Sequence, residues 1–318
     1  VVLLVAGSET PARALKAFFL APLQNKYYLG NMLNSMTTLL IAGLGIVVAF
    51  RSGLYNLGGE GQIYVSAFVV TVLGLAMPDL PASIGIPVLI LAGALSGGLM
   101  AGLSGLLRRL WKTPEIITSF LLSAAMVPVI DYLVTGPAND PARNLNATRT
   151  LPAQFWLSGM LQPSQLNTGL ILALLLAGIL FLLMFSTVWG YELRLFGLNE
   201  RFAEYAGIPP GRYAIGSLAV SGALHGITGA VMILGTYHAT ISGFTGGVGW
   251  NAIAVALVAR LHPLGAIPAA LLFAYLEAGA KASMLHTEFT IELGTIIQGV
   301  VFLFVTASIV RPRIRRSP

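Results

Sequence analysis

The sequence contains no cysteine and very few charged residues. Only 9% of its 318 residues are Asp, Glu, Lys or Arg, whereas 56% are hydrophobic. A soluble domain carries about 25% charged residues, so this chain lacks the polar surface that it would need in water. The absence of cysteine excludes disulfide bonds and thiolate chemistry. We therefore expect an integral membrane protein whose outer surface is in contact with membrane lipid.

The common signatures of catalysis are also missing. No lysine lies in the phosphate-binding pattern G-x-x-x-x-G-K-[ST], and the nucleophile pattern G-x-S-x-G does not occur. The four histidines never fall three or four residues apart, which excludes a metal site formed by local spacing. The net charge of +6 is scattered over short loops without interleaved aromatic residues, which argues against nucleic-acid binding. We expect a protein that is not an enzyme and binds no cofactor directly, with any energy source on another chain.

Long hydrophobic runs are abundant, and a helix needs roughly 20 mostly apolar residues to cross a membrane. Strands are excluded because the runs are too long and do not alternate. VVLLVAG at residues 1–7 is interpreted as the end of a truncated helix, so we predict an all-α bundle of about ten helices, forming a single transmembrane domain over residues 1–318. The glycine-rich run at 243–259 is also compatible with a re-entrant segment. The nine full runs are 33–50, 61–77, 84–107, 116–134, 168–186, 213–236, 243–259, 263–280 and 292–310.

The basic residues between these runs predict an orientation, because cytoplasmic loops carry an excess of Lys and Arg. Alternate loops hold twelve and six basic residues respectively, so the richer set and the C-terminal RPRIRR are expected in the cytoplasm. The richer set is Arg51, Arg108, Arg109, Lys112, Arg194, Arg201, Arg212, Arg260, Arg311, Arg313, Arg315 and Arg316. The poorer set is Arg13, Lys16, Lys26, Arg143, Arg149 and Lys281.

Small residues recur at four-residue spacing within two runs. There are three such rows: Gly93, Gly97 and Ala101; Gly98 and Gly102; and Gly222, Gly226 and Ala230. Such rows allow the backbones of membrane helices to approach closely and gain dispersion contacts. We expect these glycines to serve bundle packing.

One polar stretch interrupts the hydrophobic pattern: residues 53–62 read GLYNLGGEGQ. It is either a solvent-facing turn between two helices or a helix break inside the bundle, where irregular backbone is tolerated beside protein or a water-filled path. In the second case Glu60 is expected to hold the bend and Asn56 to border a solute path, with Gln62 offering further hydrogen bonds there. Pairing of these residues with Arg51 is an alternative way to lock the bend. The glycine-rich run contributes Trp250 and Asn251 as candidates for an outer gate.

A second distinctive segment is the connector at 187–212, which is predicted to carry a short amphipathic helix over residues 200–206. The side chain of Asn199 suits the N-cap, and Gly207 suits the C′ position before two prolines. Helical spacing places one apolar and one wetter set of side chains on this helix. The apolar set is Phe202, Ala203 and Ala206, the wetter set is Glu200, Arg201 and Glu204, and Tyr205 completes the segment.

Together these segments resemble one family. GLYNLGGEGQ resembles the G-L-F-N-I-G-x-E-G-Q signature of bacterial ABC importer permeases for nucleosides and related solutes, which belong to the branched-chain amino acid, simple sugar and nucleoside permease superfamily. LRLFGLNERFAEYAGI is similar to the coupling segment of that family, and SGALHGITGAVMILG and IAVALVARLHPLGAIPAALLFAYLEAGA are similar to its following helices. KTPEIITSFLLS departs from the pattern, with Pro-Glu-Ile-Ile where the family has Asn-Glu-Val-Ile. The likeness covers residues 30 to 310.

The resemblance implies a machine of several chains in the bacterial plasma membrane. It implies a second permease subunit, two cytoplasmic ATPase domains that use ATP, and an extracytoplasmic solute-binding protein. The segment from Asn199 to Gly207 would seat in a groove of the ATPase, and its movement would shift the bundle between inward-open and outward-open states. The G-x-E-G-Q form matches one of two permease types, which implies a heterodimer.

The resemblance implies nucleosides as the solute, with riboflavin or a simple sugar as alternatives carried by the same machinery. Two rival classes remain open. An ion-coupled secondary transporter would draw energy from intramembrane carboxylates, of which the sequence offers few. A membrane-embedded transferase or hydrolase would need clustered Asp, His or Arg at one membrane face, and no such cluster is evident.

Overall fold

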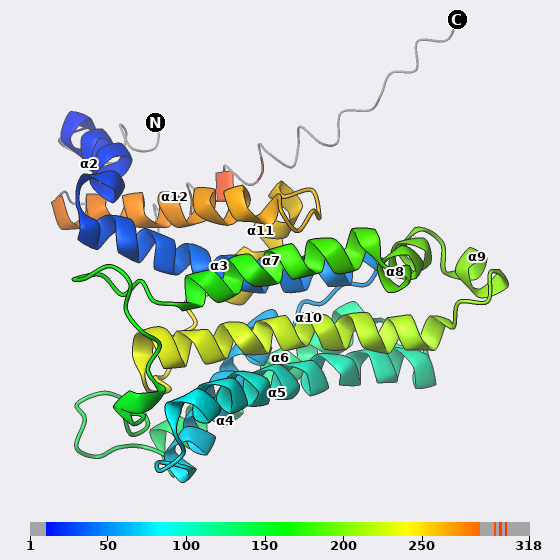
Figure 1. Ribbon diagram of the computed structural model, residues 1–318, viewed down its shortest axis with the longest axis horizontal. Coiled ribbons are helices and arrows are strands. Elements are labelled where there is room, and N and C mark those ends of the chain that lie inside the picture. The colour runs from blue at the N-terminus through cyan, green and yellow to red at the C-terminus, as the bar shows by residue number, and fades with distance from the viewer. Residues whose placement is uncertain (1–10, 287–295, 297–298, 301–302, 304–318) are drawn as a thin grey trace, which may run out of the picture.

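The computed structural model describes residues 11–286 together with residues 296, 299–300 and 303. This part of the chain is helical and contains no extended strand, which confirms the all-α prediction (Figure 1). The fragment 1–7 and nearly all of the run 292–310 lie outside the described residues.

Six described helices are long and apolar enough to cross a membrane. Each coincides with one of the hydrophobic runs, and the predicted ends agree to within four residues except at α3, which begins seven residues earlier than predicted. The six are α3 (Lys26–Arg51), α4 (Gly59–Ala76), α5 (Ala82–Trp111), α6 (Glu115–Thr135), α7 (Gly169–Ser186) and α10 (Pro210–Met232), which continues through η2 (Ile233–Tyr237). Further helices are α2 (Pro11–Gln24), η1 (Ala153–Phe155), α8 (Val188–Leu198), α9 (Glu200–Tyr205), α11 (Val248–Val258) and α12 (Ala266–His286).

The prediction of one full span over 243–259 is wrong. Only α11 is helical there, with 11 residues. The preceding turn contains Gly243, Gly246 and Gly247, all with positive φ, a conformation that glycine adopts without steric cost. Gly249 in the first turn of α11 is buried, so the helix begins inside the bundle.

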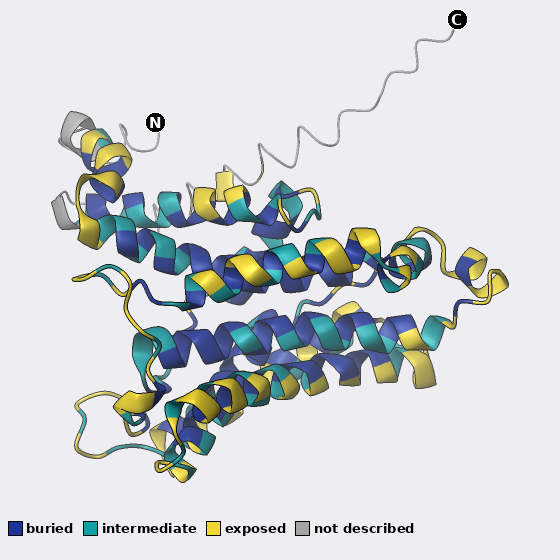
Figure 2. Cartoon of the chain, viewed as in Figure 1, coloured by how far each residue is buried: buried dark blue, intermediate teal, exposed yellow. Residues whose placement is uncertain are grey.

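Helices α3 and α10 form the centre of the bundle and α6 lies at its edge. The most apolar windows of α3 and α10 are 78% buried, whereas that of α6 is 17% buried (Figure 2). The predicted glycine rows account for the close contact of α5 with α10. A Cβ on Gly222 would lie 2.2 Å from the carbonyl oxygen of Gly97, and one on Gly226 would lie 1.9 Å from that of Gly93. These rows serve packing, as expected.

The basic residues of the richer set that the structure describes gather at one end of the bundle, here called the basic end. Arg51 ends α3 and donates from Nε to the carbonyl oxygen of Leu261 at 2.8 Å, while Arg108 at the end of α5 pairs with Glu200 of α9. Helices α8 and α9 lie at this end, and the connector 136–168 lies at the other (Figure 1).

Candidate functional site

The stretch 53–62 is a break between α3 and α4 that lies within the bundle. Residues 54–58 are not helical, yet Asn56 is fully buried and Gln62 is 1% exposed. The interpretation as a solvent-facing turn is therefore wrong. Gly59, where α4 begins, packs against the ring of His225 near the middle of α10. Helix α4 thus starts about halfway along the bundle.

Two amide side chains, one on each side of the glycines at 58 and 59, hydrogen-bond to each other across this break. Asn56 Nδ2 donates to Gln62 Oε1 and Gln62 Nε2 donates to Asn56 Oδ1, each at 2.9 Å. Asn56 Nδ2 also donates to Ser221 Oγ of α10, and its Oδ1 accepts the backbone N–H of Gly58. Buried amides need such partners, because an unpaired buried polar group costs about 1–3 kcal/mol. Asn56 and Gln62 therefore shape the break.

One polar face of α6 satisfies the backbone of the break. Glu115 Oε1 accepts the N–H of Tyr55 at 3.3 Å, and Ser119 Oγ accepts that of Leu57 at 3.1 Å. One turn further, Ser123 Oγ accepts the N–H of Gly61 at 2.7 Å. The three side chains lie four residues apart, so they share one helix face. This face supplies the acceptors that helical hydrogen bonding would otherwise provide.

Glu60 connects the break to the start of α11. Its two carboxylate oxygens accept the backbone N–H groups of Gly247, at 3.1 Å, and Gly249, at 2.8 Å. A carboxylate is favoured at this position because the first N–H groups of a helix lack internal partners and carry partial positive charge. The structure therefore places two helix starts, α4 and α11, against each other inside the bundle. Arg51 does not pair with Glu60, since its guanidinium binds the carbonyl oxygen of Leu261.

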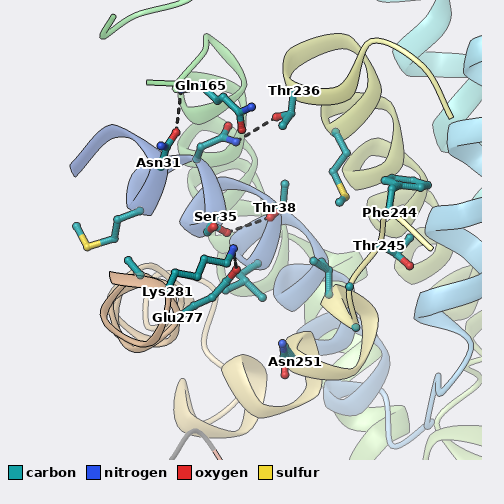
Figure 3. A pocket seen from close by; sticks show the side chains of 18 of the residues that line it. Asn31, Ser35, Thr38, Gln165, Thr236, Phe244, Thr245, Asn251, Glu277 and Lys281 are labelled. Carbon is teal, nitrogen blue, oxygen red and sulfur yellow. Dashed lines mark hydrogen bonds and ion pairs between the residues drawn. The ribbon is translucent and has the colours of Figure 1, made fainter. Parts of the chain in front are cut away.

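A cavity of about 870 Å³ lies beside this junction, between α3, η2, the segment 244–251 and α12 (Figure 3). Trp250 and Asn251 line it, whereas the side chains of Asn56, Glu60 and Gln62 do not. The polar, charged and aromatic residues of its described lining are Tyr27, Tyr28, Asn31, Asn34, Ser35, Thr38, Gln165, Thr236, Tyr237, Phe244, Thr245, Trp250, Asn251, Glu277 and Lys281. The volume falls in the range of small-molecule sites.

Hydrogen-bonding side chains from distant elements form one wall of this cavity. Asn34 Nδ2 donates to Thr236 Oγ1 at 3.1 Å, and Asn31 Oδ1 accepts the N–H of Gln165 at 2.9 Å. Among the described lining residues only Glu277 and Lys281 are charged, and they form an ion pair one helical turn apart on α12 (Figure 3). The pair carries no net charge, so the described lining is polar but neutral.

The sequence did not identify most of these lining residues. Asn31 precedes the hydrophobic run 33–50 and Asn34 lies at its start, while the predicted span 263–280 leaves Lys281 in a loop. Two signals were available: the four-residue spacing of Glu277 and Lys281 on a helix, and two amides at helical spacing at the start of α3. Neither signal shows which elements face one another.

The short helix α9 is confirmed in its position and its cap. Asn199 Oδ1 accepts the N–H of Phe202 at 3.0 Å, and Gly207 has φ +83°. Of the predicted apolar set, Ala203 is buried, whereas Phe202 is 57% exposed and Ala206 is exposed too. Ala203 packs on the bundle, and the side chain of Phe202 points away from it.

A family model described as branched-chain amino acid transport system / permease component matches residues 28–306. The chain belongs to this permease family. The permease is 33% identical over 304 residues to the probable riboflavin import permease protein RfuC of Treponema pallidum (strain Nichols), covering 96% of this chain and 81% of that protein.

Another relative is the guanosine ABC transporter permease protein NupP of Bacillus subtilis (strain 168), with 31% identity over 89% of this permease and 82% of the relative. A solved structure described as an inward-facing conformation of a putative metal-chelate type ABC transporter matches with TM-score 0.51 and 22% identity, covering 96% of both chains. That likeness concerns the fold alone. This permease is thus a membrane subunit of an ABC transporter, a class whose permease subunits are not catalytic.

Proposed function

We propose that this permease forms the path of an importer for a small neutral solute, most suitably a nucleoside, and that ATP hydrolysis by separate subunits drives the import. The observation that carries the proposal is the cavity beside the two helix starts. It reaches from Tyr27 and Lys281, near the end opposite the basic end, to Thr38 in the middle of α3. A solute entering from the opposite end would therefore meet the junction of α4 and α11.

The lining favours a planar ring with polar edges. Its aromatic side chains offer flat apolar faces for stacking, and its amides and hydroxyls offer donors and acceptors. The two charges of its described lining neutralise each other in the pair of Glu277 and Lys281. Nucleosides have such a ring and such edges, and so does riboflavin, whereas a simple sugar has the polar edges without the ring.

The exposed side chains of α8 and α9 support a docking role at the basic end. Leu198, Phe202 and Tyr205 are 83%, 57% and 92% exposed. Leu198 is the last residue of α8, and the other two belong to α9, whose start is capped by Asn199. Large exposed apolar side chains at one place are typical of a protein interface. In our proposal the segment 199–207 seats in the ATPase and the basic end is cytoplasmic, with the C-terminus on the same side.

The proposed assembly contains a second, different permease subunit, two ATPase domains and an extracytoplasmic solute-binding protein. The G-x-E-G-Q form of the break supports the heterodimer, and the cavity's position near the opposite end supports delivery by a binding protein there.

Uptake of labelled guanosine into proteoliposomes holding the whole complex tests the proposal. Uptake is expected to require ATP and the binding protein and to be unaffected by proton uncouplers. Other nucleosides are expected to inhibit it more strongly than glucose does. Trp250→Ala is expected to reduce uptake strongly, while Tyr132→Ala, which removes a 69% exposed ring that does not line the cavity, is the matched control. Uptake that depends on a proton gradient alone would favour the ion-coupled carrier. Preference for riboflavin or glucose would correct the solute.

A further inference from the structure

Arg108 is held between two carboxylates from two different helices at the basic end. It lies near the end of α5, where Nη1 pairs with Glu115 Oε2 of α6 and Nη2 pairs with Glu200 Oε2 of α9 at 2.8 Å. The side chain of Glu115 is 6% exposed, that of Arg108 is 28% exposed and that of Glu200 is 46% exposed. The bridge therefore runs from the surface helix α9 into the bundle.

Glu115 belongs at the same time to the break. Its second oxygen, Oε1, accepts the N–H of Tyr55, and Ser119, one turn further on α6, accepts the N–H of Leu57. A nearly buried carboxylate is costly without a charged partner, so the guanidinium of Arg108 fixes the side chain that orders the break. Movement of Arg108 would consequently move an acceptor of the break.

The far side of the break reaches the cavity through Glu60. Its carboxylate accepts the N–H groups of Gly247 and Gly249, and Gly247 lies in the cavity wall together with Trp250 and Asn251. A continuous set of contacts thus leads from Glu200 through Arg108 to the break, and from the break to the wall of the cavity.

The ion pair with Arg108 is the main polar contact between the described residues of α9 and the bundle. Among the described residues, the only ion pair or side-chain hydrogen bond between the side chains of α9 and another helix is the one between Glu200 and Arg108. Ala203 also packs on the bundle, but contact through a methyl group does not fix the orientation of α9. The directional hydrogen bonds of a planar guanidinium do fix it.

We propose that Arg108 is the positioning residue that transmits the displacement of α9 to the break and, through Glu60, to the cavity wall. The proposal rests on the proposed function, because it takes α9 as the contact of the ATPase. Coupling of this kind requires an element with two arrangements that both sites bias, and the non-helical segment 54–58 is that element. The alternative is that the two ion pairs of Arg108 only stabilise the fold, in which case the more exposed pair with Glu200 contributes up to about 1 kcal/mol and has no part in coupling.

The test compares Arg108→Gln with Arg109→Gln, a neighbouring exposed arginine that pairs with no carboxylate among the described residues. Both variants are assembled into the whole complex, and guanosine uptake and ATP hydrolysis are measured on the same proteoliposomes. For Arg108→Gln we expect uptake per ATP hydrolysed to fall about tenfold, the size of a typical coupling free energy, with assembly and hydrolysis retained. Arg108→Lys, which keeps the charge but not the fork, is expected to restore coupling only in part. Arg109→Gln is expected to match wild type.

A second readout follows the break itself. The chain has no cysteine, so Tyr55→Cys introduces a single thiol, at a position that is 48% exposed. Its labelling rate by a maleimide is expected to change when ATP is added, and this ATP response is expected to vanish with Arg108→Gln. A merely stabilising ion pair would leave the response in place.

The outcomes separate the two ideas. If wild-type uptake does not require ATP, the proposed function is wrong and the inference fails with it. If wild type is ATP-driven but Arg108→Gln keeps its uptake per ATP and its labelling response, only the inference is wrong. Should Arg108→Gln fail to assemble, Glu200→Gln decides, because Glu200 is half exposed and its loss leaves Glu115 paired. Normal coupling in that variant overturns the inference.

Discussion

Replacing Glu60 by alanine is expected to loosen the start of α11. The substitution removes both acceptors of the N–H groups of Gly247 and Gly249. A hydrogen bond to a charged group contributes about 1.5–3 kcal/mol, and we take the lower end because the side chain is partly exposed. Two such bonds give about 3 kcal/mol, which corresponds to roughly a hundredfold change in a local opening equilibrium.

Hydrogen exchange followed by mass spectrometry measures this opening. In Glu60→Ala, peptides covering 244–251 are expected to exchange about a hundredfold faster than in wild type, while peptides from the centre of α3 are unchanged. Glu60→Gln keeps one side-chain oxygen, so an intermediate increase is expected. Glu204→Ala removes an exposed carboxylate from α9 and is the matched control.

An unchanged exchange rate at 244–251 in folded Glu60→Ala would refute the reasoning, since it would mean that the carboxylate does not hold the start of α11. Faster exchange throughout the chain would indicate general destabilisation, and the comparison would then rest on Glu60→Gln.

Three further predictions follow from other contacts. Gly222→Leu is expected to lower the melting temperature of the purified protein strongly, because its Cβ alone would lie 2.2 Å from the carbonyl oxygen of Gly97; an unchanged melting temperature would contradict the packing of α5 on α10. The ring of His238 stacks on that of Trp156 with the ring centroids 4.0 Å apart. Burial lowers the pKa of His238 below its ordinary value of 6.5. Its contribution to stability is thus present above pH 6.5 and is lost as the pH falls below that value, so the difference in melting temperature between wild type and His238→Gln should shrink between pH 7.5 and 5. Asn251→Ala is expected to raise the KM for uptake more than it lowers kcat, because the residue lines the cavity; an unchanged KM would remove it from the solute path.

The spans and the short helix could be predicted because their causes are local. A run of apolar residues such as 84–107 specifies a helix in lipid by its length alone. The same holds for α9, since Asn199 caps it and Gly207 ends it within one stretch of chain. The glycine rows were predictable for a similar reason, although only the structure shows that α5 and α10 are the two partners.

The candidate site could be predicted only in part. The sequence singled out the polar residues of the break, and the structure shows what they contact: Asn56 pairs with Gln62 nearby and with Ser221, which is 165 positions away. Local spacing contains no information on such a partner. Trp250 and Asn251 were expected near a gate and do line the cavity, but most of its other residues come from α3 and α12.

Composition, run length and capping by themselves determined a helical membrane protein with a capped surface helix, since each depends on neighbouring residues and on the solvent. The tertiary structure decided that the break is buried, that Glu60 joins two helix starts and that Arg108 joins α9 to α6. These features depend on which helices pack together. In lipid the apolar surfaces of helices are nearly equivalent, so polar groups and small residues distant in sequence select the arrangement.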